Sequence, residues 1–416
     1  YRLSAPVDAI ALYRRGLALL AQMPESTSRT RLELALQMNL EAPLLVTQGW
    51  GAPERAAVLE RAYALAQQLG DTPDLLIVLY ALTDLCTAQA RHIQALDYAE
   101  QLLALAQQVG DRGYEALGYR MTGTAHFFLG HYREARAHLE NGLSCYAAVT
   151  GQASSSDAPI ERAVFLWAWL PHILFALGYP EQAAARSREA LACVQPDGPA
   201  YAQAMMLTMA CVTFYAIARQ PEATLRHAKA LLALTETYDL AAFQGWAIFC
   251  RGWARTALGQ TQAGLSEMVA GWEHLQATGA QSSLSPLLTL LAEAYLKDGA
   301  IEKAEETLHQ VLALAEQNGE RSHLAEIYRV QGGLHLKQSA LGAAEASFER
   351  AIQVARDQAA RLWDLRATVD LARLWAAQGR GAEGRARLVQ VYNAFTEGFD
   401  MPDLTAARAL LDALSS

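Results

Sequence analysis

The 416-residue sequence predicts an all-α solenoid of stacked helical hairpins, and two observations support this prediction. Small residues recur along the whole chain at spacings of 39, 40, 48, 41, 40, 40, 40 and 40 residues. A turn lies five residues before each of them, as at Gly130 and Gly299. A fixed period of this length is typical of stacked supersecondary units rather than of one closed core. The recurring small residues are Ala56, Ala95, Ala135, Ala183, Thr224, Gly264, Ala304, Ala344 and Gly384.

Residues 112–151 illustrate a single repeat. Apolar side chains follow helical spacing up to the turn at Gly130 and resume it after the turn. Gly123 stands twelve residues before Ala135, so the two antiparallel helices of the hairpin have small residues where they would cross. Because side-chain size sets the distance between helix axes, the hairpin can close tightly. We therefore expect about nine to ten such hairpins in a right-handed superhelix. The position of Gly123 is occupied elsewhere by Gly252, Ala292, Gly332 and Ala372.

The predicted organisation is one repeat array over residues 1–416. Its parts are a partial first repeat and lead-in (1–50), repeats (51–150), a polar loop insertion (151–159), repeats (160–390) and a C-terminal capping helix (391–416). The insertion explains the one long interval and is interpreted either as a functional lid or as slack between hairpins. Residues 9–13 align with the second helix of a later hairpin, which suggests a piece of a longer protein.

Three repeats depart from the pattern at the first small position. They carry Thr83, Pro171 and Val212 where Gly or Ala stands in the others. We expect these residues to bend or widen the hairpins in the middle of the array, because each is larger than the residue that it replaces.

Composition argues against several functional classes. The net charge is −9, from 34 basic and 43 acidic residues, and no basic block is present, so nucleic-acid binding is not predicted. No apolar run reaches the roughly 18 residues of a membrane helix, and no signal peptide is evident, so we expect a cytoplasmic protein. The five cysteines are scattered without a Cys-x-x-Cys pair, which predicts free thiols.

The sequence holds no motif for catalysis or for a cofactor. A phosphate-binding Gly-x-x-x-x-Gly-Lys loop, a His-Glu-x-x-His metal motif and a Gly-x-Ser-x-Gly nucleophile motif are all missing from it. His126, His131 and His138 cluster in sequence but straddle a turn, so we expect them on different helices and different faces. We predict neither an enzyme nor a metal site.

The repeat pattern resembles the tetratricopeptide repeat (TPR). A small residue in the first helix is followed by an aromatic residue three positions on, as at Tyr215, Tyr295 and Trp375, then by the turn and the small residue of the second helix. The period exceeds the usual length of about 34 residues. Longer hairpins of this kind are similar to the sensor superhelices of large bacterial regulatory ATPases.

The resemblance to TPR arrays implies a concave groove lined by the first helix of each hairpin. Carried over by register, the candidate groove residues are Arg120, Phe127, Phe128, Phe165, His172, Phe175, Met206, Met209, Trp246, Phe249 and Trp253. Such aromatic and methionine-rich walls suit an apolar small molecule or a hydrophobic protein segment. The alternative is that these rings pack between repeats as core. If Phe127, Phe128, His172, Trp246 and Trp253 form a binding surface, at least two of these five should remain partly exposed.

The C-terminal segment resembles that of a more particular group. Residues 395–400 (Phe-Thr-Glu-Gly-Phe-Asp), followed by Pro402, Asp403 and Leu404, are similar to the end of bacterial multidomain signalling ATPases, whose catalytic domains precede such repeats. The resemblance implies a non-catalytic sensor or interaction domain, whose partner is an intramolecular ATPase module or another polypeptide. The alternatives are a stand-alone scaffold and an enzyme acting on a small molecule in the groove.

Overall fold

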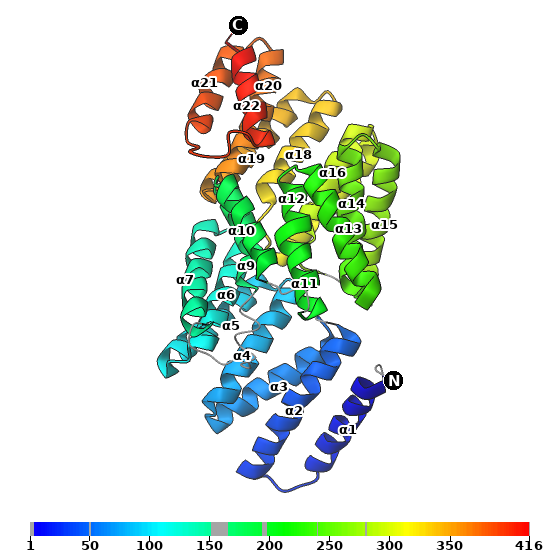
Figure 1. Cartoon of the computed structure of the whole chain (residues 1–416), viewed down its shortest axis with the longest axis vertical. Coiled ribbons are helices and arrows are strands. Elements are labelled where there is room, and N and C mark those ends of the chain that lie inside the picture. The colour runs from blue at the N-terminus through cyan, green and yellow to red at the C-terminus, as the bar shows by residue number, and fades with distance from the viewer. Residues whose placement is uncertain are drawn as a thin grey trace. The chain divides into compact units, whose positions relative to one another are not determined.

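The structure is a computed structural model that describes residues 4–49, 51–150, 165–193, 198–238, 240–278 and 281–415. Every regular element among these residues is a helix, and successive helices pair as antiparallel hairpins (Figure 1). The predicted fold class, an all-α solenoid of TPR-like hairpins, is confirmed. The predicted insertion at 151–159 lies outside the described residues.

Contacts within the chain divide it into two compact units. Unit 1 comprises Tyr1–Ala125, His138–Ala163 and Thr278–Ser282, and unit 2 comprises His126–Ala137, Val164–Ala277 and Ser283–Ser416. Helices α6 and α7 belong to both, because their ends at the connecting turn fall in unit 2. Both units are built from the same kind of helical hairpin. The single array over residues 1–416 stays a prediction.

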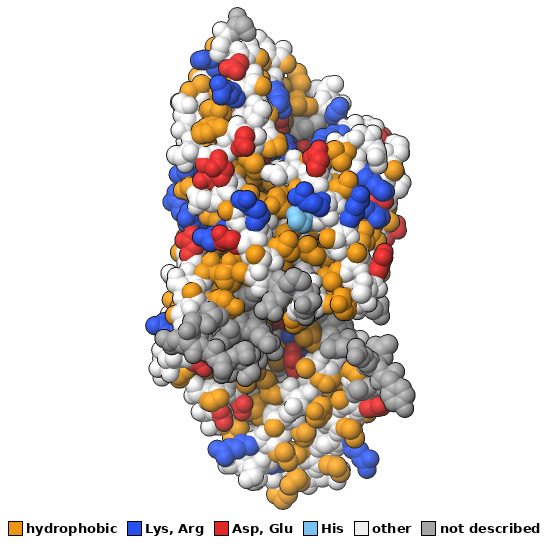
Figure 2. Space-filling model, viewed as in Figure 1, with side chains coloured by type: hydrophobic (Ala, Val, Ile, Leu, Met, Phe, Trp, Pro, Cys, Tyr) orange, Lys and Arg blue, Asp and Glu red, His pale blue; other side chains and the backbone are white. Residues whose placement is uncertain are grey.

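Unit 1 holds the first helices of the chain and most of α6 and α7. They are α1 (Ser4–Leu20), α2 (Thr27–Gln48), α3 (Pro53–Leu69), α4 (Thr72–Ala88), α5 (His92–Val109), α6 (Arg112–Phe128) and α7 (Tyr132–Thr150). An apolar cluster in this unit joins α2, α3 and α4, with Leu59, Leu65 and Leu85 almost fully buried. Figure 2 shows basic and acidic side chains interspersed with apolar ones on the face in view.

Unit 2 holds the remaining helices. They are α9 (Leu166–Ala176), α10 (Pro180–Ala192), α11 (Ala200–Met206), η1 (Leu207–Thr213), α12 (Phe214–Ile217), α13 (Pro221–Tyr238), α14 (Ala241–Ala257), α15 (Thr261–Ala277), α16 (Ser285–Asp298), α17 (Ile301–Asn318), α18 (Leu324–Lys337), α19 (Leu341–Asp357), α20 (Arg361–Ala377), α21 (Gly381–Tyr392) and α22 (Pro402–Ala413). The candidate site lies entirely in this unit.

The turn has a left-handed backbone before eight of the nine small residues. Glycine tolerates this conformation because it lacks a Cβ atom, and it occupies five of these turns. Arg219 is an exception, with a φ of 56°, which is uncommon for a residue with a side chain. The turn positions with positive φ are Ala90, Gly130, Gly178, Arg219, Gly259, Gly299, Ser339 and Gly379. Each precedes its small residue by five positions, so the predicted register of the hairpins is correct.

The small residues are where the paired helices meet. A Cβ atom on Gly252 in α14 would lie 2.6 Å from the carbonyl oxygen of Gly264 in α15. A Cβ atom on Gly332 in α18 would clash with the ring of Phe348 in α19. Ala304 and Ala344 are fully buried at the corresponding positions of their repeats. The small residues that recur about every forty positions therefore lie where the two helices of a hairpin come closest.

Two of the three predicted departures fall in unit 2. Pro171 lies inside α9. Val212 lies in the buried π-helical segment η1, where each backbone bond spans one residue more than in an α-helix. The wider winding agrees with the expectation that a larger residue would distort this repeat.

One stretch of the described residues, Ala200–Ile217, is long and apolar enough to cross a membrane by length and composition. The expectation that no run reaches this length is therefore wrong. However, 72% of the stretch is buried inside the folded chain. Its apolar character is that of a core segment, because every residue of η1 and α12 within it is buried.

Candidate binding site

Ten of the eleven candidate groove residues belong to unit 2, and Arg120 belongs to unit 1. Arg120 donates a hydrogen bond from Nη2 to the Tyr80 hydroxyl at 3.0 Å. Phe165 is half-buried, and the other candidates are buried. Phe127, Phe128, His172, Trp246 and Trp253 are 3%, 1%, 5%, 5% and 7% exposed. The expectation that at least two of these five stay partly exposed is therefore wrong.

The rings are covered because later repeats of unit 2 pack against earlier ones. The covering segment is the loop Glu320–His323, between α17 and α18. The backbone amide of Arg321 donates to the Phe128 carbonyl oxygen at 2.7 Å, and that of Ser322 donates to the same atom at 3.2 Å. Phe128 is the last residue of α6, where carbonyl oxygens point beyond the helix and can accept bonds from other segments. These bonds hold the loop Glu320–His323 at the place where the sequence predicts an open groove.

A second contact connects the same loop to α7 and α20. The Tyr132 hydroxyl donates to the carbonyl oxygen of Ser322, and the Trp363 indole Nε1 donates to the Tyr132 hydroxyl at 3.1 Å. Tyr132 and Trp363 lie more than 200 residues apart in sequence and are 1% and 2% exposed. Burial raises the pKa of Tyr132 far above its usual range, so its hydroxyl remains protonated. This chain of bonds satisfies backbone groups that a buried loop would otherwise leave unpaired.

An aromatic cluster lies beneath the loop. The rings of Phe127 and Phe128 lie 5.2 and 5.1 Å from that of Trp169. The His172 ring lies 5.9 Å from Trp169 and 5.8 Å from Phe214. These are the separations at which aromatic side chains attract each other beyond their area burial.

The cluster encloses a cavity of about 10 Å³, enough for roughly one water molecule. Five of the eleven sequence-predicted residues line it: Phe127, Phe128, His172, Met209 and Trp246. Trp169, Thr213, Ile217, Ser283, Pro286, Glu320, Ser322 and His323 complete the lining. We call this space the aromatic cavity.

Two polar groups in the aromatic cavity are incompletely paired. Glu320 Oε1 accepts a bond from the Ser322 hydroxyl at 3.1 Å, whereas Oε2 is buried without a protein hydrogen-bond partner among the described residues. The same is true of Nε2 of His323. Burial raises the pKa of Glu320 to about 7, although hydrogen bonds from Ser285 and Ser322 act in the opposite direction. Burial also lowers the pKa of His323 to about 3, so a carboxyl group that titrates near neutrality and a neutral imidazole lie in the wall of the cavity.

His172 is also neutral and is held by the π-helix. Its Nε2 lies 2.7 Å from the carbonyl oxygen of Met209, so this nitrogen carries the proton and donates. Burial lowers the pKa of His172 to about 4. In a π-helix each backbone hydrogen bond spans one residue more than in an α-helix. In η1 the carbonyl oxygen of Met209 accepts the hydrogen bond from His172 of α9.

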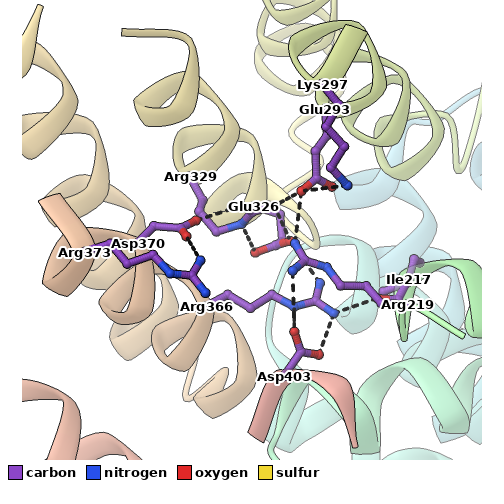
Figure 3. Close-up of polar contacts among 10 residues, drawn as sticks. All are labelled: Ile217, Arg219, Glu293, Lys297, Glu326, Arg329, Arg366, Asp370, Arg373 and Asp403. Carbon is purple, nitrogen blue, oxygen red and sulfur yellow. Dashed lines mark hydrogen bonds and ion pairs between the residues drawn. The ribbon is translucent and has the colours of Figure 1, made fainter. Parts of the chain in front are cut away.

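A network of buried charges lies in the same unit (Figure 3). Arg366 of α20 donates from Nε and Nη2 to both oxygens of Asp403 at 2.8 Å. Its Nη1 donates to Glu326 at 3.0 Å, and Nη2 also donates to the carbonyl oxygen of Ile217 at 2.7 Å. One guanidinium therefore joins α12, α18, α20 and α22. We call the residues drawn in Figure 3 the arginine network.

Arg329 and Arg219 extend the arginine network. Arg329 donates to Glu326 at 2.9 Å, to Asp370 at 2.9 Å and to Glu293 at 3.3 Å. Arg219 donates to Glu293 at 3.2 Å from its left-handed turn. Although burial opposes ionisation, the surrounding arginines lower the pKa of Glu326 to about 2 and that of Glu293 still further. Paired in this way, the buried carboxylates stay charged.

The arginine network adjoins the aromatic cluster. The Arg366 guanidinium lies 5.0 Å from the ring centre of Trp363 and 5.6 Å from that of Phe175. The Trp363 ring in turn lies 5.8 Å from that of His323. Contacts of this kind combine cation–π attraction with packing. The network thereby fixes residues that surround the aromatic cavity.

The C-terminal motif singled out in the sequence docks within unit 2. Glu397 Oε1 accepts bonds from the backbone amides of Glu181 and Gln182 at 3.0 and 3.1 Å. The Gly398 amide donates back to the Glu181 carboxylate at 2.7 Å. A carboxylate at the first turn of α10 caps amides that have no intrahelical partner. The motif holds the end of the array against an earlier hairpin.

The other candidate residues predicted from the sequence do not line the aromatic cavity. Met206 and Phe249 are fully buried between helices, and Trp253 is buried outside the cavity lining. His126 and His131 were expected on different faces, but their Nδ1 atoms lie 3.2 Å apart, because the short turn brings both helix ends together. No three His, Cys, Asp or Glu side chains among the described residues form a group that could hold a metal ion.

Sequence reasoning missed Glu320, His323 and the arginine network. A signal for the network is present in the repeat register. Glu326 and Arg366 are 40 residues apart and occupy the same position of successive first helices. Opposite charges at one register position predict a pair between neighbouring repeats. Glu320 has no comparable signal, because it lies just past Gly319 in what the sequence presents as an ordinary helix end.

Comparisons with known proteins agree with this fold. The family model of the tetratricopeptide repeat matches residues 283–357. A Rap protein crystallised with competence and sporulation factor is 13% identical, with 92% of this chain and 99% of that chain covered and a TM-score of 0.61. A signal transduction ATPase with numerous domains and a TPR sensor, from Pyrococcus horikoshii, is 15% identical, with 92% and 54% covered and a TM-score of 0.46. No curated protein matches the chain.

The chain thus has the fold of a TPR-like helical array, and residues 283–357 match the repeat family itself. Folds of this class are typically non-catalytic and serve as protein-interaction domains. At this level of identity the likeness to the Rap protein is one of fold. Neither the ligand nor the partner follows from it.

Proposed function

We propose that this chain is the sensor domain of a larger, cytoplasmic bacterial signal-transduction ATPase. In this proposal an apolar small ligand or a protein segment enters the aromatic cavity, and the occupied array reports to the ATPase module. The observation that supports it best is the convergence of aromatic rings on a cavity whose Glu320 and His323 atoms lack protein partners. Ligand sites of proteins are apolar concavities with a few convergent polar groups.

The arginine network gives this sensor a means of transmission. The loop Glu320–His323 supplies Glu320, Ser322 and His323 to the lining of the cavity, so a bound ligand would bear directly on this loop. His323 packs against Trp363, which lies beneath Arg366, and Arg366 holds α22 through Asp403. Occupancy of the cavity would therefore change the position of the C-terminal helix relative to earlier hairpins of unit 2.

The cavity is tested by substituting Trp246 with Phe. This change trims one wall of the cavity, and Trp272→Phe is its matched control, since Trp272 is similarly buried but does not line the cavity. We expect Trp246→Phe to weaken binding of the co-purifying ligand or partner several-fold and Trp272→Phe to leave it unchanged, while both cost similar stability. Equal binding by the two variants would show that the aromatic cavity is not the binding site.

The alternative is a stand-alone scaffold that binds a partner without an ATPase. The two are separated by the gene upstream of the codon for Tyr1. A reading frame that continues upstream into a Gly-x-x-x-x-Gly-Lys-Ser/Thr phosphate loop supports the sensor. A start codon with no such module upstream supports the scaffold. Hydrolysis of ATP by the full-length protein, measured with wild-type Trp246 and with Trp246→Phe, then tests the coupling.

A further inference from the structure

A second cavity of unit 2, of about 60 Å³, is lined by members of the arginine network. Its charged wall consists of Arg219, Arg366, Asp370, Arg373 and Asp403, all drawn in Figure 3. Polar atoms form part of the wall that solvent reaches, and no residue lines both this cavity and the aromatic cavity. We call this space the arginine cavity.

The two carboxylates of the arginine cavity are already engaged. Both oxygens of Asp403 accept hydrogen bonds from Arg366 at 2.8 Å. Asp370 accepts from Arg329 at 2.9 Å through Oδ2 and from Arg373 at 3.1 Å through Oδ1. A cationic ligand would therefore compete with a guanidinium for every carboxylate oxygen of this wall.

Two guanidinium groups of the same wall keep free donors. Among the described residues, Arg219 makes one hydrogen bond, to Glu293, and a longer ion pair of 3.7 Å with Asp403. Arg373 makes one hydrogen bond, to Asp370. A guanidinium has five N–H donors, and these two side chains are 34% and 55% exposed. The arginine cavity therefore presents donors that a ligand can reach from solvent.

The charge balance favours a ligand with one negative charge. Three arginines and two aspartates line the cavity, and the arginine network as a whole has five cations and four carboxylates. Although burial opposes ionisation, the arginines hold the pKa values of Glu293 and Glu326 far below their usual range, so both count as charged. A monoanion completes this balance. A dianion would leave excess negative charge beside the two aspartates, and charge out of water is costly unless it is paired.

The rest of the wall sets the size and polarity of the ligand. Val369, Pro402 and Ala406 supply apolar surface. At about 10–15 Å³ for each water-sized group, the cavity has room for roughly four to six of them, about the size of a short-chain carboxylate. The first turn of α22 also lies in this wall and has no side-chain cap, and a helix N-terminus attracts an anion.

We propose that the arginine cavity binds a carboxylate group on a short apolar stem, with Arg219 and Arg373 as its donors. Val369, Pro402 and Ala406 surround the stem. The carboxylate belongs to a free short-chain acid or to the C-terminal residue of a peptide. This second ligand site is separate from the aromatic cavity, so it goes beyond the proposed function and does not depend on it.

The test is isothermal titration calorimetry of the whole chain with butyrate, with n-butanol as its neutral analogue and with inorganic phosphate. A peptide that ends in valine, with a free or an amidated C-terminus, distinguishes a peptide source from a free acid. Arg373→Gln removes one donor group from an exposed position. Arg219→Gly removes the other at a φ of 56°, which glycine adopts without strain. Arg361→Gln is the control, because Arg361 is exposed on α20 and does not line the cavity.

We expect saturable binding of butyrate or of the free-carboxylate peptide, roughly fivefold weaker binding to Arg373→Gln and to Arg219→Gly, and unchanged binding to Arg361→Gln. If Arg219→Gly loses the fold, Arg373→Gln alone decides. Equal affinity for n-butanol or for the amidated peptide overturns the proposal, as does tighter binding of phosphate. Lack of saturable binding by every probe also overturns it, and would indicate that the arginine cavity holds water only. Each of these failures leaves the aromatic cavity untouched, since Trp246→Phe tests it separately.

Discussion

Arg366 and Asp403 form a bidentate ion pair, with both nitrogen–oxygen distances at 2.8 Å and side-chain exposures of 5% and 4%. Asp403 lies at the start of α22, directly after the C-terminal motif that the sequence marks. A paired guanidinium is the cation best suited to burial against a carboxylate, because its fork matches both oxygens. The end of the array is therefore tied to its interior by charge.

Substitution of Arg366 with Met should strongly destabilise the protein. It removes one charge and leaves the buried carboxylates of Asp403 and Glu326 short of a partner, which typically costs roughly 3–5 kcal/mol. Urea denaturation measures the loss. Arg408→Met, on the exposed face of α22, should stay within about 0.5 kcal/mol of wild type. Similar values for both variants would show that the arginine network does not stabilise the fold.

The pH dependence of stability should reveal Glu320. Its pKa is about 7 in the folded chain because of burial, and its ordinary value is 4.5. Between these values the unfolded chain has released the proton and the folded chain still holds it, so the contribution of Glu320 to the free energy of unfolding falls as pH rises. The fall should reach roughly 3 kcal/mol by pH 8, and Glu320→Gln should lack it. Parallel profiles for wild type and variant would mean that the carboxyl group is solvated.

Adjacent alanines in α19 test the register of the hairpins. Ala344 is fully buried against the neighbouring helix, and Ala343 is exposed. Ala344→Leu should overpack the hairpin and cost on the order of 1–3 kcal/mol, whereas Ala343→Leu should be nearly silent. Thermal unfolding of the two variants measures the difference. A larger loss of stability for Ala343→Leu than for Ala344→Leu would show that a different face of α19 packs against α18.

Two glycines provide a test of close helix contact. A Cβ atom on Gly264 would lie 2.5 Å from the carbonyl oxygen of Gly252, whereas one on Gly342 would meet nothing within 4 Å. Gly264→Ala should therefore force α14 and α15 apart and lower the melting temperature. Gly342→Ala should raise stability by up to about 1 kcal/mol, since Ala is the better helix former. A stabilising Gly264→Ala would contradict the close approach.

The hairpins could be predicted from the sequence because their determinants are local and repeat. Gly252 and Gly264 are twelve residues apart, and the same pair of small residues recurs in one repeat after another. The left-handed turns follow from the same register, even where Arg219 or Ser339 replaces glycine. Repetition turns a weak local signal into a reliable one.

The covering of the predicted groove could not be predicted in the same way. It depends on contacts such as Tyr132 with Ser322 and Trp363, between residues about 190 and 231 positions apart. No period relates these residues, and aromatic side chains at helical spacing are equally compatible with an open groove or a packed core. The sequence therefore identified the rings around the aromatic cavity but not the loop that covers them.

The measurement that tests the central claim most directly is native mass spectrometry of the protein purified from its own host. The account predicts that the wild-type chain and Trp272→Phe carry a ligand or partner that unfolding releases, and that Trp246→Phe carries markedly less of it. Circular dichroism should show the same helicity in all three proteins. Equal retention by the two variants, or a bare polypeptide mass for all three proteins, would contradict the assignment of the aromatic cavity as the binding site.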